Sequence, residues 1–300
     1  MKLTNISEVR EIMEQNGLRF NKQFGQNFLI NEAVPRRIAE ECGAKPEDGI
    51  LEIGPGIGTL TRELAARYRK VVAVEIDRNL IPVLGQTLSD FDNVTIINDD
   101  VMKTDLKALL AEHFPGMRVT VCANLPYYIT TPILMKLLES DVFFDNITVM
   151  VQKEVAVRLT SLPGSAEYGS ITASVGWYGK SEKLFGVSAG SFLPAPKVDS
   201  AVVRISLYEK PPYPVRDEAL LFRVIRAAFG QRRKTLLNSM TSFFPELTKN
   251  ALEEAIVSAG FSSGIRGETL STEDFAKLEE SLYDALGKPG ENDNRTERKE

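Results

Sequence analysis

The residues with the clearest chemical potential are Asn124, Leu125, Pro126 and Tyr127, which directly follow an apolar, strand-like run. An Asn side-chain oxygen and a neighbouring backbone carbonyl can accept hydrogen bonds from an aromatic amine, whose lone pair is otherwise delocalised into its ring. Such acceptors favour the positive charge that develops when the amine attacks an electrophile. Pro126 stiffens the loop, and the face of Tyr127 can stack on a base, which contributes about 1–3 kcal/mol. The pattern predicts a catalytic loop that activates an exocyclic amine, and the alternative is a plain strand-ending turn.

A glycine turn forms the second candidate site. Gly54, Gly56 and Gly58 separate an apolar run from a helical stretch, and glycines let the backbone approach a ligand closely. Glu75 follows about 20 residues later, at the end of the next apolar run, where a Rossmann-type sheet places a carboxylate against a ribose. The pair predicts a site for an adenosine-containing ligand. A structural turn with a fortuitous acidic residue is the alternative.

Acidic residues around the glycine turn narrow the choice of ligand. Dinucleotide sites use the pattern Gly-x-Gly-x-x-Gly. This chain instead has Gly-x-Gly-x-Gly, with Glu52 just upstream. A carboxylate there suits a cationic ligand better than a pyrophosphate, and S-adenosylmethionine carries an ammonium, a sulfonium and a ribose. Asp100 follows the third strand-like run, at the same predicted sheet edge, where it can accept a hydrogen bond from an adenine amino group. S-adenosylmethionine is therefore the predicted cofactor.

Alternating apolar and amphipathic stretches must position these residues. Strands are predicted at 49–53, 71–76, 94–97, 118–123 and 147–151, and helices at 58–68, 78–88 and 131–139. Strands that alternate with helices form a parallel, doubly wound sheet. With a late β-rich run at 198–207, the sequence predicts an α/β fold, a Rossmann-like domain with an N-terminal arm over residues 1–210.

A cluster of three prolines, Pro211, Pro212 and Pro214, ends this domain because proline continues neither a helix nor a central strand. Beyond it, helical periodicity covers 218–229, 234–243, 247–259 and 272–286. We therefore predict a smaller, all-helical domain over 211–286, followed by a polar, disordered tail over 287–300.

The composition excludes several classes of protein. The chain has 300 residues, 43% of them hydrophobic and 26% charged, which is typical of a globular protein. No apolar run reaches the roughly 18 residues that a membrane span needs, and a charged N-terminus argues against an export signal. One histidine and two cysteines without a Cys-x-x-Cys pair exclude a conventional zinc site, so no metal is expected. We expect a cytoplasmic protein without membrane contact.

A net charge of −5 hides a basic stretch between residues 219 and 245, which contains no Asp or Glu. It carries Arg223, Arg226, Arg232, Arg233 and Lys234. A phosphate backbone responds to this local field rather than to the average, so the stretch is predicted to bind RNA. The alternative is a solvated helix face.

Several segments together resemble a known family. Asn124 to Tyr127 resembles the signature of methyltransferases that act on the amino group of adenine in RNA. The segments 23–29 and 192–200 resemble the N-terminal motif and the post-core motif of the rRNA adenine dimethyltransferases. With 52–56 and 152–155 they follow the family order across residues 19–207, and the match is nearest to the branch that modifies small-subunit (16S) rRNA.

The resemblance implies a function and a set of site residues. Members dimethylate the exocyclic amino groups of two adjacent adenosines in the 3′-terminal hairpin loop of 16S rRNA, within the small (30S) subunit or its precursor, late in its biogenesis. Tyr127 and Phe192 are expected against the target adenine. We expect Phe192 as an exposed ring because Pro194 and Pro196 stiffen its loop; a core phenylalanine is the alternative. Cofactor contacts are implied for Asn27, Leu29, Gly54, Glu75, Asp100 and Asn124, and the glycine turn adds Gly56.

Two other functions stay open. The same core occurs in 23S rRNA adenine methyltransferases of the macrolide-resistance type, and an assembly factor that acts mainly by binding is the alternative outside enzymes. An NAD-dependent oxidoreductase fits poorly, because of the glycine spacing. Nothing in the sequence demands more than a monomer.

Overall fold

The computed structural model describes residues 2–18, 25–231 and 233–287, and the chain divides into two compact units. The first comprises Met1–Val157 and Gly179–Glu209, and the second comprises Arg158–Tyr178 and Lys210–Glu300. This division differs from the prediction, which placed residues 158–178 in the first domain. They join the second unit because Ala173 and Trp177 are buried in its helical core. The tail predicted over 287–300 lies, beyond Gly287, outside the described residues.

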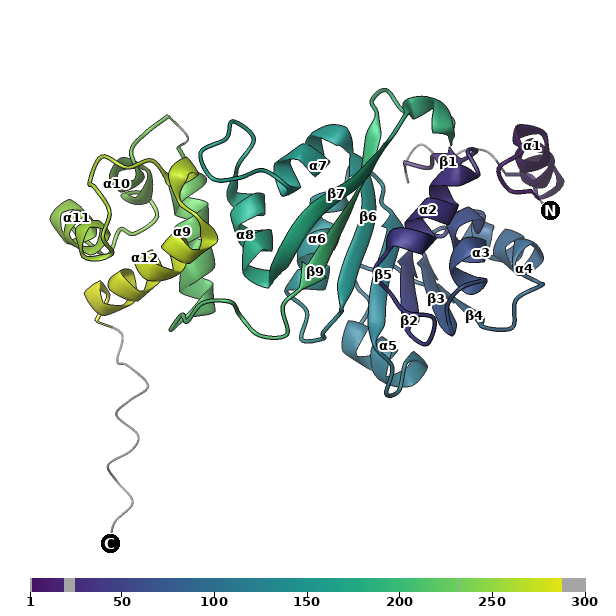
Figure 1. The fold of residues 1–300 in the computed structure, drawn as a ribbon, viewed down its shortest axis with the longest axis horizontal. Helices are drawn as coiled ribbons and strands as arrows, with labels where there is room; N and C mark the ends of the chain where they lie inside the picture. Colours follow the sequence, from purple (N-terminus) through teal and green to yellow (C-terminus); the bar gives the residue numbers. More distant parts are fainter. Residues whose placement is uncertain (1, 19–24, 232, 288–300) are drawn as a thin grey trace, which may run out of the picture. The chain divides into compact units, whose positions relative to one another are not determined.

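A seven-stranded sheet in the order β4-β3-β2-β5-β6-β9-β7 forms the centre of the first unit (Figure 1). Its strands are β2 (Gly49–Ile53), β3 (Lys70–Glu75), β4 (Val94–Asn98), β5 (Val119–Asn124), β6 (Asn146–Gln152), β7 (Gly179–Val187) and β9 (Ser200–Leu207). Strands β2 to β6 run parallel, while β9 and β7 pair antiparallel at one end. The predicted parallel, doubly wound core is confirmed, and two antiparallel strands extend it.

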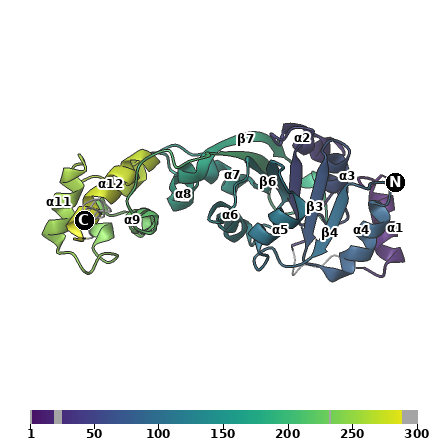
Figure 2. The same ribbon diagram turned by 90° about the horizontal axis from the view of Figure 1, so that it is seen from below.

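Helices flank both faces of this sheet. Helices α2 (Ala33–Glu41) and α3 (Thr59–Ala65) lie on one side, and α5 (Leu106–His113) and α6 (Thr130–Leu138) lie on the other (Figure 2). Because both faces are covered, every residue of β2 is buried, which explains its continuous apolar run. The shorter elements η2 (Arg78–Leu80), α4 (Ile81–Thr87), α7 (Lys153–Leu159) and η3 (Ala189–Ser191) connect these layers.

The strand order reverses between β2 and β5. The chain runs from β2 through β3 to β4 on one side, and then returns to place β5 and β6 on the other. Ligands of doubly wound sheets bind at such a reversal, outside the carboxyl ends of the strands. Gly54 follows β2 there and Asn124 ends β5, so the two candidate motifs stand side by side.

The N-terminal segments close over this edge. Helix α1 (Ile6–Gln15) buries Val9, Ile12 and Met13 in a cluster with Phe28 and Leu80. Strand β1 (Phe28–Leu29) pairs antiparallel with β8 (Phe192–Leu193), which joins the N-terminal motif to the post-core motif.

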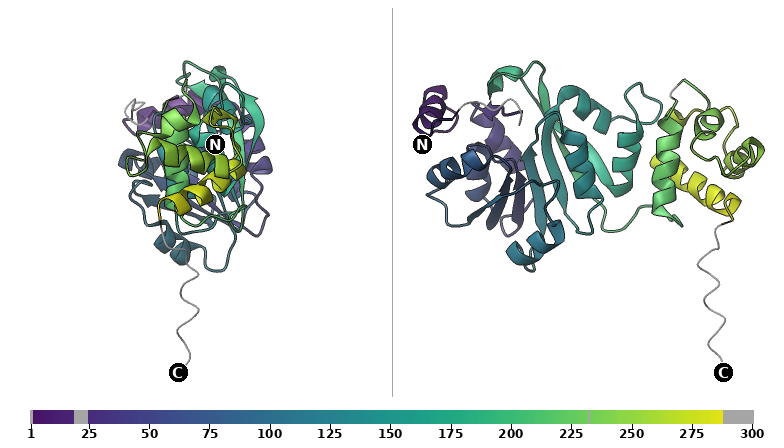
Figure 3. Two further views of the ribbon diagram at one scale, coloured as in Figure 1. Left: turned by 90° about the vertical axis from the view of Figure 1, so that its left-hand side faces the viewer. Right: turned by 180° about the vertical axis from the view of Figure 1, so that it is seen from behind.

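The second unit is helical. It contains α8 (Ser170–Tyr178), α9 (Glu218–Phe229), α10 (Leu236–Met240), α11 (Lys249–Ser258), η4 (Gly267–Thr269) and α12 (Thr272–Ala285). Helices α9 to α12 gather into one cluster (Figure 3). A capping box of Ser271 and Asp274 begins α12, and the Asp217 side chain caps α9.

Candidate active site

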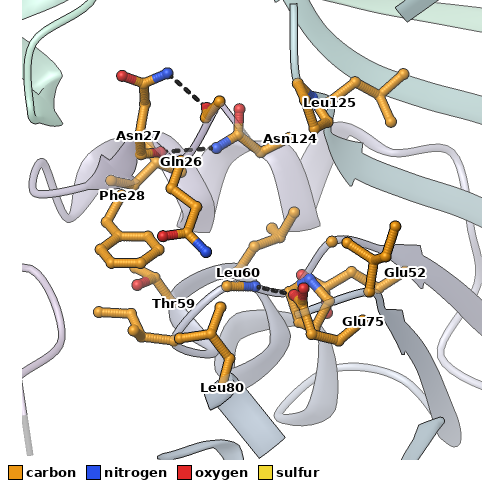
Figure 4. Close-up of a pocket in the computed structure, with 18 of the residues that line it drawn as sticks. Gln26, Asn27, Phe28, Glu52, Thr59, Leu60, Glu75, Leu80, Asn124 and Leu125 are labelled. Atoms are coloured by element: carbon orange, nitrogen blue, oxygen red, sulfur yellow. Dashed lines mark hydrogen bonds between the residues drawn. The ribbon is translucent and has the colours of Figure 1, made fainter. Parts of the chain in front are cut away.

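A cavity opens where the sheet reverses its order. Four segments line it, at residues 25–29, 52–60, 75–80 and 124–127. Figure 4 shows Asn27 and Asn124 on one side of this cavity and Glu52 and Glu75 on another. The predicted residues that the structure brings together here are Asn27, Leu29, Gly54, Gly56, Glu75, Asn124, Leu125, Pro126 and Tyr127.

Glu52 is the most deeply buried acidic residue of the cavity, with 1% of its surface exposed. Its Oε2 atom has no hydrogen-bond partner among the described residues. Burial raises the pKa of Glu52 from 4.5 to about 8, and the nearby charge of Glu75 adds to the rise. A buried carboxylate oxygen that lacks a donor fits a ligand that carries positive charge.

Glu75 ends β3 at the floor of the cavity. Its Oε2 accepts a hydrogen bond from the Gly56 backbone N–H at 3.2 Å, and its Oε1 accepts one from the Asp77 N–H at 2.8 Å. Burial raises the pKa of Glu75 to about 7. The carboxylate is thus held in place by the glycine turn, with lone pairs left for the hydroxyls of a ribose.

The glycine turn keeps the cavity open. Gly54 and Gly56 adopt left-handed conformations, with φ of +68° and +61°. A Cβ on Gly54 would meet no atom within 4 Å, so its backbone faces free space that a ligand can occupy. A Cβ on Gly56 would instead lie 3.2 Å from Cε1 of Phe28.

Asn124 lines the cavity, and its amide nitrogen is anchored to the N-terminal motif. Its Nδ2 donates to the Asn27 carbonyl at 3.2 Å, and Asn27 Nδ2 in turn donates to the Gly25 carbonyl at 2.9 Å. These bonds tie the N-terminal motif to the catalytic loop. They also fix the orientation of the Asn124 amide, so that its Oδ1 remains available as an acceptor for an amine.

The loop after Asn124 is rigid. Leu125 is buried and donates its N–H to the Met150 carbonyl at 3.2 Å. Tyr127 shares a hydrogen bond of 2.6 Å with the Ser200 hydroxyl at the start of β9, and burial raises the pKa of its phenol. The Tyr127 ring lines the cavity in a fixed orientation, as a stacking surface for a base requires.

Two predicted residues do not line the cavity. Asp100 folds back on its own turn: its Oδ1 accepts from the Met102 N–H at 3.0 Å, and its Oδ2 lies 3.8 Å from the Lys103 ammonium. Phe192 is only 2% exposed and belongs to the core of the first unit, so the expectation of an exposed ring was wrong. Pairing of β8 with β1 turns this ring into apolar surroundings.

The cavity also uses residues that the sequence reasoning passed over. Thr59, Leu60, Ile76 and Leu80 complete its wall. Ile76 is 45% exposed and directly follows Glu75. An apolar residue directly after the acidic residue at the end of a strand was the sequence signal that could have identified it as a cavity residue.

The basic residues predicted to bind RNA differ in their surroundings. Arg223 pairs with Glu246 at 2.6 Å and lies over the Phe244 ring, so its charge is compensated within the unit. Arg226, Arg233 and Lys234 are exposed and form no ion pair with any residue that the structure describes. Arg232 lies outside the described residues.

None of the helices that the structure describes has the length and apolar character of a membrane span.

A sequence model of the family described as ribosomal RNA adenine dimethylase matches residues 17–282. The ribosomal RNA small subunit methyltransferase A of Lachnoclostridium phytofermentans is 49% identical over 279 residues, covering 92% of this chain and 96% of that protein.

Solved structures agree with this match. A dimethyladenosine transferase from Plasmodium falciparum superposes with a TM-score of 0.70 at 25% identity, over 86% of this chain and 98% of its own. The 23S rRNA methyltransferase ErmE superposes with a TM-score of 0.66 at 28% identity, over 85% and 99%. The chain therefore belongs to the ribosomal RNA adenine dimethylase family, whose members take their methyl groups from S-adenosylmethionine.

Proposed function

We propose that this enzyme dimethylates the exocyclic amino groups of two adjacent adenosines in the 3′-terminal hairpin loop of 16S rRNA. Its substrate is the small ribosomal subunit or a late precursor of it, and it acts as a monomer in the cytoplasm. The observation that carries the proposal is the Asn124 side chain, which lines the cavity together with Glu75 and Tyr127 and whose amide nitrogen is held by the Asn27 carbonyl.

The acidic residues and the glycine turn would hold the cofactor. When bound, S-adenosylmethionine supplies an electrophilic methyl group on a sulfonium. Glu75 would accept hydrogen bonds from the ribose, and Glu52 would place its unpartnered oxygen toward the positive charge. The open space beside Gly54 leaves room for the amino acid part of the cofactor. Asp100, at the same edge, would accept from the adenine amino group after its local turn rearranges.

The catalytic loop would prepare the acceptor amine. Asn124 Oδ1 and the Leu125 carbonyl would accept hydrogen bonds from the two amino hydrogens, which raises electron density on nitrogen and favours its developing positive charge. The ring of Tyr127 would stack on the adenine and fix the distance to the methyl group. Positioning supplies most of the acceleration, for which intramolecular reactions allow about 7–11 kcal/mol. The alkylated amine then loses a proton to solvent without a dedicated base.

Charge on the second unit supports an RNA substrate. Arg226, Arg233 and Lys234 are exposed and free to contact phosphates. Contacts with phosphates position an RNA on the protein but do not read its base sequence. The small subunit is favoured over the large one because the identity to the small-subunit methyltransferase, 49%, is far higher than the 28% to ErmE.

Transfer of labelled methyl groups tests the proposal. The enzyme is incubated with labelled S-adenosylmethionine and either undermethylated small subunits or large-subunit RNA, and the products are digested to nucleosides. Dimethyladenosine in the small-subunit sample alone is the expected result. Label in large-subunit RNA would contradict the target, and absence of label from both samples would contradict the enzymatic role.

A further inference from the structure

Tyr128 is the most exposed aromatic side chain in the described part of the chain, with 62% of its surface accessible. It is next to Tyr127 but does not line the cofactor cavity, whereas its neighbours Gly25, Pro126 and Tyr127 do. Its ring therefore lies at the rim of the cavity, on the solvent side. The ring is therefore not part of the hydrophobic core.

The backbone presents this ring rigidly. The Pro126 carbonyl accepts two hydrogen bonds, from the Ile129 N–H at 3.2 Å and from the Thr130 hydroxyl at 3.1 Å. Tyr128 thus stands in a closed turn that immediately precedes α6. A tyrosine side chain has only two torsion angles to fix, so it loses little conformational freedom when it binds a partner.

The glycine of the N-terminal motif supports one side of the ring. A Cβ on Gly25 would lie 3.4 Å from Cδ1 of Tyr128, at van der Waals contact, so the Gly25 backbone lies next to the ring. With Gly25 against one side and 62% of the side chain still accessible, the remaining surface is open to a planar ligand.

We propose that Tyr128 is a second stacking platform, which binds the base next to the target adenine in single-stranded RNA. This inference rests on the proposed function, in which the two target adenosines are adjacent. When one adenine occupies the cavity beside Tyr127, its neighbour must lie within one nucleotide of the rim, where Tyr128 stands. Single-stranded bases stack on such rings because every base has a π-face.

The platform gives the enzyme a way to hold both adenosines at once. One base enters the cavity while the other waits on Tyr128, and an exchange between the two positions would present the second adenine without release of the RNA. Tyr128 is a positioning residue in this scheme and makes no contact with the methyl group.

Three variants of the full chain test the platform on undermethylated small subunits. Tyr128→Ala removes the ring, Tyr128→Phe keeps it, and Tyr208→Ala removes another exposed ring, 42% accessible, as the matched control. Loss of one stacked base is expected to weaken subunit binding roughly 5- to 150-fold in Tyr128→Ala. Tyr128→Phe and Tyr208→Ala should bind like the parent, and all three should keep its affinity for S-adenosylmethionine, which also reports correct folding.

Unchanged subunit affinity in Tyr128→Ala would overturn the platform, as would an equal loss in Tyr128→Phe. A photo-reactive phenylalanine at position 128 separates RNA from protein as the partner. A cross-link to the nucleotide beside the target supports the inference, and a cross-link only to a ribosomal protein refutes it. Failure of the proposed function is recognised separately, because the parent enzyme would then transfer no methyl group to small subunits.

Discussion

Replacement of Glu52 by Gln should stabilise the cofactor-free protein at neutral and alkaline pH. Glu52 is 1% exposed, and its Oε2 lacks a partner among the described residues, so the fold disfavours its charged form. Burial raises its pKa from 4.5 to about 8. A neutral amide of nearly the same shape removes that electrostatic cost.

The size of the effect follows from proton linkage. Between pH 4.5 and 8 the unfolded chain ionises Glu52 while the folded chain keeps the proton, and each pH unit costs about 1.4 kcal/mol. Because the folded pKa is raised, the contribution of this group is fully present below pH 4.5 and is lost as the pH rises through 8. From pH 5 to pH 8 the parent should lose about 3.5 kcal/mol through Glu52 alone, because the unfolded chain is not yet fully ionised at pH 5 and the folded chain is half ionised at pH 8. Burial also raises the pKa of Glu75, so ionisation of Glu75 lowers the stability of parent and variant equally as the pH rises.

Urea unfolding followed by far-UV circular dichroism at pH 5, 6.5 and 8 measures this effect. The stability of Glu52→Gln relative to the parent should rise by about 3.5 kcal/mol over this range, which at an m-value of about 2–3 kcal/mol/M shifts the urea midpoint by about 1–2 M. Glu47→Gln, which alters an exposed carboxylate, should leave the difference flat. A constant stability difference between Glu52→Gln and the parent from pH 5 to pH 8 would show that Glu52 has the same pKa in the folded and unfolded chain.

Three further predictions concern the cofactor, the glycine turn and RNA. Glu75→Ala should weaken S-adenosylmethionine binding about 10- to 100-fold in calorimetry, because ribose hydrogen bonds to a carboxylate are lost; unchanged affinity would contradict this role. Gly56→Ala should lower the free energy of unfolding by about 1–2 kcal/mol, since its φ is +61° and a Cβ would press on Phe28. Replacing Arg233 and Lys234 together with Gln should reduce RNA affinity and make its salt dependence shallower by about 1.5 in log–log slope. A solvated helix face would leave that slope unchanged.

The central strands could be predicted from sequence because their residues are buried on both faces. Strand β2 has the predicted bounds, 49–53, and its five residues are all buried. Strand β7 was missed because it is the last strand of the sheet, and its residues 180–184, which include two Lys and one Glu, are all exposed or only partly buried. No continuous apolar run marks such an edge strand.

Site residues close to a strand end were also predictable, whereas those that depend on distant pairing were not. The carboxyl ends of β2, β3 and β5 meet at one edge, so motifs directly after them converge. The burial of Phe192 depends on its pairing with Leu29, 163 positions earlier in the chain. Arg223 pairs with Glu246, which comes 23 residues later in the chain. Glu246 directly follows the stretch 219–245 that contains no Asp or Glu. Neither contact has a local sequence signal.

The central claim is that Asn124 aims the acceptor amine, and a comparison of Asn124→Ala with the parent tests it most directly. Methyl transfer to undermethylated small subunits under single-turnover conditions and the dissociation constant for S-adenosylmethionine are measured side by side. Methyl transfer by Asn124→Ala should be slower by on the order of 10²–10³, while cofactor affinity changes far less. Transfer at the parental rate would contradict it, and so would a loss of affinity as large as the loss of rate.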